Sequence, residues 1–186
     1  MRSWLRFSRA IDRLNERLGR LIGWLTLAMV LIGSYNTVVR YLGRFLGGNL
    51  SSNAYLELQW YLFSLVFLLG AAYTFHRNAH VRVDLIYGRL SARGRAWVDL
   101  LGTVFLMLPF TGFALWVSWP SVRNSWAVRE VSSDPGGLAR YPIKTVILFA
   151  FALLILQGLS QVIRQVAVLR GQGPAPSGDT RREVHL

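Results

Sequence analysis

Cysteine is absent from this 186-residue sequence, and histidine is scarce. Without a thiol the chain can form no disulfide bond and can offer no thiolate to a metal. The three histidines, His76, His80 and His185, lie outside the long apolar stretches, so facing imidazoles for a membrane-embedded heme are missing. No phosphate-binding glycine loop or dinucleotide fingerprint is present. We therefore expect no cofactor, no metal site and no enzymatic activity.

Charged residues are missing from four long apolar stretches, residues 21–39, 58–75, 100–119 and 145–163. At a rise of about 1.5 Å per residue, a helix of this length crosses the roughly 30 Å hydrocarbon core of a bilayer. A helix of a soluble protein is usually shorter and apolar on one face only. The sequence thus predicts an all-α membrane protein with four transmembrane helices, at about residues 21–39, 58–75, 97–119 and 143–163.

The rest of the chain contains no segment long enough for a separate soluble domain. We assign residues 21–170 to one four-helix transmembrane domain, and we expect an uncleaved first span, because no small-residue cleavage site follows it. Residues 171–186 are rich in Gly, Pro, Ser and charge, which predicts a disordered tail.

Acidic residues are few, nine against 21 basic ones, and the arginines gather beside the apolar stretches. This placement favours membrane borders over nucleic acid as the reason for the net charge of +12. Fifteen of the basic residues lie in the two tails and the second connection, and six lie in the first and third connections. The positive-inside rule therefore predicts that both termini are cytoplasmic.

Residues 1–20 have the pattern of an amphipathic helix. Apolar side chains recur at helical spacing, at Trp4, Phe7, Ile11, Leu14 and Leu18. Arginines recur on nearly the opposite face, at positions 2, 6, 9, 13, 17 and 20. This pattern predicts a helix lying in the cytoplasmic membrane interface, with arginines toward anionic headgroups. Packing of the apolar stripe on a partner protein is the alternative.

Polar residues in the connections are the candidate partner contacts. Glu57 opens the second span, where it suits a helix N-terminus or pairs with Arg40 or Arg44. The second connection contributes Asn78, His80, Arg82 and Asp84. The third connection contains a strong turn signal at residues 132–137 and contributes Arg129, Glu130, Arg140 and Lys144. Ser91 suits the N-cap of the third helix, and Pro109 should kink that helix.

Several of these segments together form a recognisable pattern. They are residues 56–63 with 70–74, residues 78–84, Ser118-Trp119-Pro120 with Ser125-Trp126, Gly136-Gly137-Leu138 with Pro142-Ile143-Lys144, and residues 156–158. In them the chain resembles the small membrane subunit (DctQ type) of tripartite ATP-independent periplasmic (TRAP) transporters. The resemblance covers about residues 53–165. Ala139 and Tyr141 depart from it, since this type often has Pro and Trp there.

The resemblance implies a role in solute uptake across the bacterial inner membrane. In such transporters a periplasmic solute-binding protein (DctP type) captures an organic acid or related solute. A large permease subunit (DctM type) then moves the solute inward, driven by a sodium gradient. The small subunit would sit in the bilayer beside the large one as a scaffold.

Two other functions remain open from the residues alone. Four helices without internal charge could form a self-sufficient small channel or carrier by dimerising, although such sites usually need broken helices and intramembrane charges. The chain could also anchor an oxidoreductase in the membrane.

Overall fold

A computed structural model describes residues 2–47, 52–79, 87 and 89–171. His80, Arg82 and Asp84, and the expected tail beyond Gly171, lie outside these residues. The described part is almost entirely helical. Its elements, in chain order, are α1 (Arg2–Leu46), α2 (Asn53–His76), α4 (Ala92–Gly102), the π-helical turn η1 (Thr103–Met107), α5 (Leu108–Ala127) and α6 (Arg140–Leu169).

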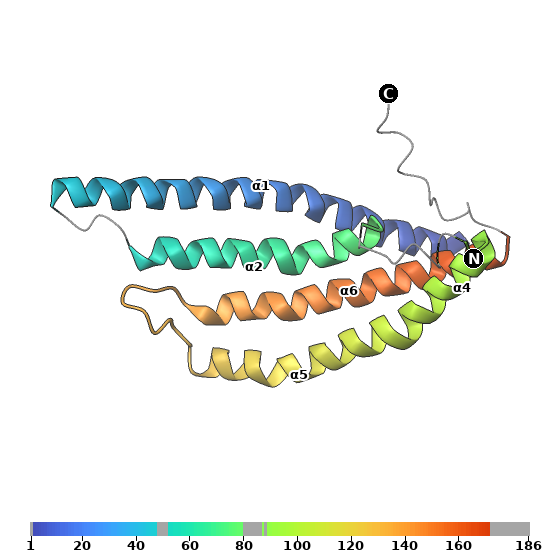
Figure 1. Ribbon diagram of the computed structural model, residues 1–186. Coiled ribbons are helices and arrows are strands. Elements are labelled where there is room, and N and C mark those ends of the chain that lie inside the picture. Colours follow the sequence, from blue (N-terminus) through green and yellow to red (C-terminus); the bar gives the residue numbers. More distant parts are fainter. Residues whose placement is uncertain (1, 48–51, 80–86, 88, 172–186) are drawn as a thin grey trace, which may run out of the picture.

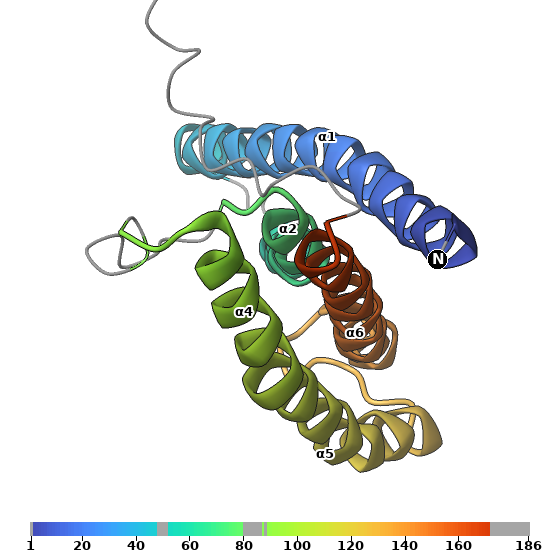
Figure 2. The same cartoon turned by 90° about the vertical axis from the view of Figure 1, so that its right-hand side faces the viewer.

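The helices lie side by side as an elongated bundle (Figure 1). Because α4, η1 and α5 follow one another without a break, they form a single long rod. In both views α2 and α6 lie between α1 and this rod, and α6 packs against each of the other helices (Figures 1 and 2). Within the described residues, four helical segments are long and apolar enough to cross a membrane, which confirms the predicted number of spans.

The first helix differs from the prediction in its continuity. Residues 3–20 are helical as expected, but α1 runs from Arg2 to Leu46 without a break between the amphipathic segment and the span. Ile11 is buried in the bundle, whereas Trp4, Phe7 and Leu14 are exposed. The outward face keeps its apolar side chains, so the location of this segment at a membrane surface stays a prediction.

The third span begins and bends through recognisable local chemistry. Ser91 caps α4 by accepting a hydrogen bond from the Gly94 N–H at 3.2 Å, which confirms the predicted N-cap. Pro109 has no N–H to donate four residues back. The π-helical turn directly before it shifts the hydrogen bonding, and the Leu108 N–H donates to the Thr103 carbonyl five residues back. Figure 2 shows the rod curving through this region.

Glycines set how closely the helices approach. A Cβ at Gly19 of α1 would lie 2.4 Å from the ring of Tyr73 in α2, and a Cβ at Gly158 of α6 would lie 2.8 Å from Leu108 Cδ2. Such small residues are a common means of close packing between membrane helices. Large apolar side chains point outward instead; Trp24, Phe67 and Trp116 are each at least two-thirds exposed. Polar groups gather at the two ends of the bundle.

Candidate partner-binding sites

The connection between α5 and α6 folds into a defined hairpin, residues 128–139, here called the α5–α6 hairpin. Val131 and Ala139 pair as an antiparallel bridge, and the Ser132 N–H donates to the Leu138 carbonyl at 3.0 Å. The turn closes with a hydrogen bond from the Gly137 N–H to the Asp134 carbonyl at 3.0 Å. The turn predicted at residues 132–137 is therefore present, at the end of the bundle where α2 begins (Figure 1).

Glu57 fastens this hairpin to α2. Its buried carboxylate accepts hydrogen bonds from the Ser132 hydroxyl and the Leu138 N–H. The sequence-based expectations for Glu57 were wrong: α2 starts at Asn53, so Glu57 is past the first turn, and among the described residues no ion pair joins it to Arg40 or Arg44. The partner of Glu57 is instead Ser132, in a loop 75 residues further along the chain. Local spacing in the sequence does not reveal a contact over that separation.

Gly137 is required by the close approach of the hairpin to Glu57. A Cβ at this position would lie 2.4 Å from Ser132 Cβ and 2.9 Å from Glu57 Oε1. Neither neighbour can withdraw freely, since Ser132 belongs to the paired backbone and the Glu57 carboxylate is held by two donors. Any side chain here must therefore displace the hairpin from α2.

Glu130 and Lys144 form a second fastening, between the hairpin and α6. Lys144 Nζ donates to Glu130 Oε2, and the Ser125 hydroxyl donates to the same oxygen at 2.7 Å. The hydrogen bond from Lys144, aided by that from Ser125, lowers the pKa of Glu130 from its ordinary value of 4.5. Because the folded-state pKa is depressed, this stabilisation is complete above pH 4.5 and is lost as the pH falls through the lower folded value.

A polar cluster at the opposite end ties α1, α2 and α6 together. Asp12 of α1 is its centre: Oδ2 accepts from Arg164 Nη1 at 3.0 Å, and Oδ1 accepts from the Ser160 hydroxyl at 3.0 Å and from Gln157 Nε2 at 3.3 Å. His76 Nδ1 of α2 lies 3.3 Å from the same Oδ1. This Asp12 cluster thus links three helices through one carboxylate.

Two further polar residues of α1 extend the Asp12 cluster along α6. Asn15 Nδ2 donates to Gln157 Oε1 at 2.6 Å, and the hydroxyls of Ser8 and Ser160 are 2.7 Å apart. All four side chains are buried. The sequence analysis missed Ser8, Asp12 and Asn15. Their spacing of four and three residues, on one face of the amphipathic segment, is the signal that would have found them.

With both ends described, comparison with protein families is informative. Residues 29–168 match the family described as "Tripartite ATP-independent periplasmic transporters, DctQ component". The chain belongs to the DctQ family. Comparisons with curated proteins and with solved structures gave no match.

Membership confirms the resemblance noted in the sequence and gives the DctQ chain its general role. It is the DctQ component of a TRAP transporter, and this family is a transport component, not an enzyme. Together with the four apolar helices, the match supports a multi-pass membrane protein. No group of three potential metal-binding side chains comes together within the described part of the chain.

Most of the contacts predicted around the third connection of the DctQ chain already form hydrogen bonds within the fold. Glu57, Glu130 and Lys144 fasten the α5–α6 hairpin, and Arg140 Nη2 donates to the Ser132 hydroxyl at 3.3 Å. Arg129 differs, because it is exposed and has a left-handed backbone, with φ at 48°. Arg129 is therefore an exposed member of the predicted contacts, and its role as a contact stays a prediction.

Asn78 terminates α2 in the DctQ chain. Its φ of 58° lies in the left-handed region, which Asn tolerates better than most residues. The Asn78 N–H donates to the Phe75 carbonyl at 3.1 Å, and the next N–H, of Ala79, reaches the Thr74 carbonyl at 3.0 Å. Asn78 thus has a local role in ending the helix, and the other predicted contacts of this connection, His80, Arg82 and Asp84, lie outside the described residues.

Proposed function

We propose that this DctQ-family chain is a static scaffold for the large permease subunit (DctM type) in sodium-driven uptake of an organic acid or related solute. A periplasmic solute-binding protein (DctP type) would deliver the solute. The complex would lie in the bacterial inner membrane, with both termini of this chain cytoplasmic. The α5–α6 hairpin would then face the periplasm and the Asp12 cluster the cytoplasm.

The observation that carries this proposal is the fastening of the bundle at both ends. At one end Glu57, Glu130 and Lys144 hold the hairpin to α2 and α6. At the other end the Asp12 cluster holds α1 to α2 and α6. Helices α2 and α6 take part in the fastenings at both ends, so they cannot slide or rock against each other without breaking these hydrogen bonds. This arrangement suits a support against which another subunit moves.

The middle of the bundle argues against a carrier. The four apolar stretches contain no charged residue, whereas ion and solute sites in membranes usually rely on intramembrane charges and broken helices. Pro109 does not open a site, because the π-helical turn beside it keeps the backbone hydrogen-bonded. The outward-facing Trp24, Phe67 and Trp116 offer apolar surface to lipid or to a large membrane partner.

Within this scheme, two connections between helices supply the proposed contacts. Arg129 would meet the solute-binding protein at the periplasmic side. Residues 78–84, including His80, Arg82 and Asp84, would hold the large subunit in register at the cytoplasmic side.

Reconstitution separates the scaffold from the alternatives. Liposomes containing this chain alone, the large subunit alone or both are given a sodium gradient and the solute-binding protein carrying the ligand that co-purifies with it. We expect uptake only when both subunits are present. Uptake by this chain alone would favour a self-sufficient carrier, and a heme or flavin absorption band in the purified chain would favour an oxidoreductase anchor.

A further inference from the structure

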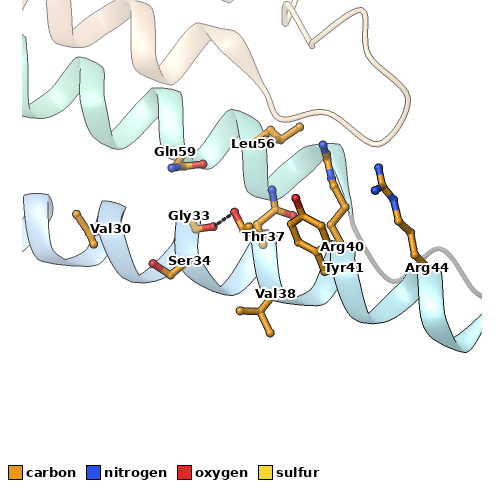
Figure 3. Close-up of a pocket in the computed structure, with 11 residues that line it drawn as sticks. Val30, Gly33, Ser34, Thr37, Val38, Arg40, Tyr41, Arg44, Leu56 and Gln59 are labelled. Carbon is orange, nitrogen blue, oxygen red and sulfur yellow. Dashed lines mark hydrogen bonds between the residues drawn. The ribbon is translucent and has the colours of Figure 1, made fainter.

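A groove runs between α1 and α2 near the end of the bundle that carries the α5–α6 hairpin (Figure 3). Its volume is about 820 Å³, and we call it the α1–α2 groove. Val30, Gly33 and Ser34 lie toward the middle of the bundle, Thr37 and Gln59 follow, and Leu56, Arg40 and Arg44 lie toward its end. Neither the hairpin fastenings nor the Asp12 cluster uses this groove.

The charged part of the groove is arranged to receive an anion. Arg40 and Arg44 are one helical turn apart, both are exposed, and both extend from α1 toward the side on which α2 lies (Figure 3). The Arg44 guanidinium lies 5.6 Å from the centre of the Tyr41 ring, a contact that orients it. Among the described residues neither arginine forms an ion pair with a carboxylate. Two like charges this close repel, so a shared anion would stabilise the site.

The groove has about the length of one membrane leaflet. From Val30 to Arg40, α1 rises about 15 Å, half of the roughly 30 Å hydrocarbon core. Gly33 allows α2 to approach closely at this level, because the Gln59 side chain occupies the space where a Cβ would be, with Nε2 at 2.2 Å from it. With Val30 near the bilayer centre, the guanidinium groups of Arg40 and Arg44 stand at headgroup depth.

We propose that the α1–α2 groove binds one anionic phospholipid. Its phosphate accepts hydrogen bonds from the guanidinium groups of Arg40 and Arg44, whose planar donor forks match phosphate oxygens. One acyl chain lies along Val30 and Leu56. Free phosphate would contact only the arginines, whereas an acyl chain would also cover the rest of the groove, which lies at hydrocarbon depth. The bound lipid would fill the space between α1 and α2 and add to the rigidity of the bundle.

Native mass spectrometry of the full-length chain, released from micelles that contain equal amounts of phosphatidylglycerol and phosphatidylcholine, tests this site. The wild-type protein should retain phosphatidylglycerol in preference to phosphatidylcholine. Each arginine near an anionic lipid surface is worth about fivefold in affinity, so the double variant Arg40→Gln/Arg44→Gln should bind roughly 25-fold more weakly. The matched control is Arg123→Gln, an exposed arginine at the same end of the bundle, which should bind as wild type does.

Two further experiments identify the molecule bound in the groove. Ser34→Trp places a large side chain in the groove between Val30 and the arginines and should also reduce lipid retention, at an unchanged melting temperature. Glycerophosphoglycerol, the headgroup without acyl chains, should fail to displace the lipid. Equal retention in the double variant and the Arg123→Gln control would overturn the proposal. Displacement by the headgroup alone would overturn it in favour of a phosphate site, and loss of the lipid on binding of the large subunit would overturn it in favour of a protein interface.

Discussion

Replacing Asp12 with alanine should destabilise the folded chain by about 3 kcal/mol, the largest loss expected from a single substitution at either end of the bundle. The carboxylate accepts hydrogen bonds from Arg164, Ser160 and Gln157, and its removal leaves Arg164 without its carboxylate and takes one acceptor each from Ser160 and Gln157. Thermal unfolding of the purified chain in detergent, or its unfolding equilibrium, measures the loss.

Glu16→Ala is the matched control, because Glu16 lies one turn further along the same helix. Its carboxylate is about half exposed and faces Arg77 at 3.6 Å, and exposed pairs of this kind contribute at most about 1 kcal/mol. Asp12→Asn should fall between the two, since an amide oxygen still accepts from Ser160 but brings no charge to Arg164. Equal losses for Asp12→Ala and Glu16→Ala would show that the Asp12 cluster does not hold the helices together.

Gly137→Val should have the largest effect on transport. A Cβ at this position collides with Ser132 and with the Glu57 carboxylate, so the α5–α6 hairpin must leave its seat on α2. If the hairpin receives the solute-binding protein, as proposed, the affinity of that protein for the complex should fall at least about tenfold, or 1.4 kcal/mol. Binding of the labelled solute-binding protein to the reconstituted two-subunit complex measures this, alongside co-purification of the large subunit, which should be retained.

Two variants of the same hairpin separate its shape from its charge. Ser133→Ala, at an exposed position of the turn, should leave binding unchanged. Arg129→Glu reverses the exposed charge without touching the fastenings, so binding should weaken while limited proteolysis still finds the hairpin folded. Wild-type affinity in both Gly137→Val and Arg129→Glu would place the docking surface elsewhere.

The features that depend on local pattern could be predicted from the sequence. The four spans follow from uninterrupted apolar stretches, the start of the third helix follows from Ser91, and the turn of the hairpin follows from its Ser-Asp-Pro-Gly composition. Each rests on residues within a few positions of one another, where spacing alone determines the structure.

The fastenings at the two ends could not be predicted, because their partners are far apart in the chain. Glu57 meets Ser132 across 75 residues, and Asp12 meets Arg164 across 152 residues. Arginine is abundant near every span end, so a sequence alone offers Asp12 many equivalent cations. The choice of Arg164 comes from the packing of α1 against α6, which small and polar side chains such as Ser8 and Ser160 permit.

The absence of cysteine makes the proposed static role measurable, because engineered cysteines are the only thiols of this chain and can be spin-labelled before the complex is assembled. Exposed positions near the two ends, Arg93 of α4 and Ser133 of the α5–α6 hairpin, would be replaced by Cys in the two-subunit complex. Pulsed electron–electron double resonance then gives the distance between the labels, without and with sodium and the loaded solute-binding protein. A rigid scaffold predicts one narrow distance between the two labels of this chain, the same in both conditions. The distance between a label on this chain and a label on the large subunit should change. A shifted or second distance within this chain would contradict the account.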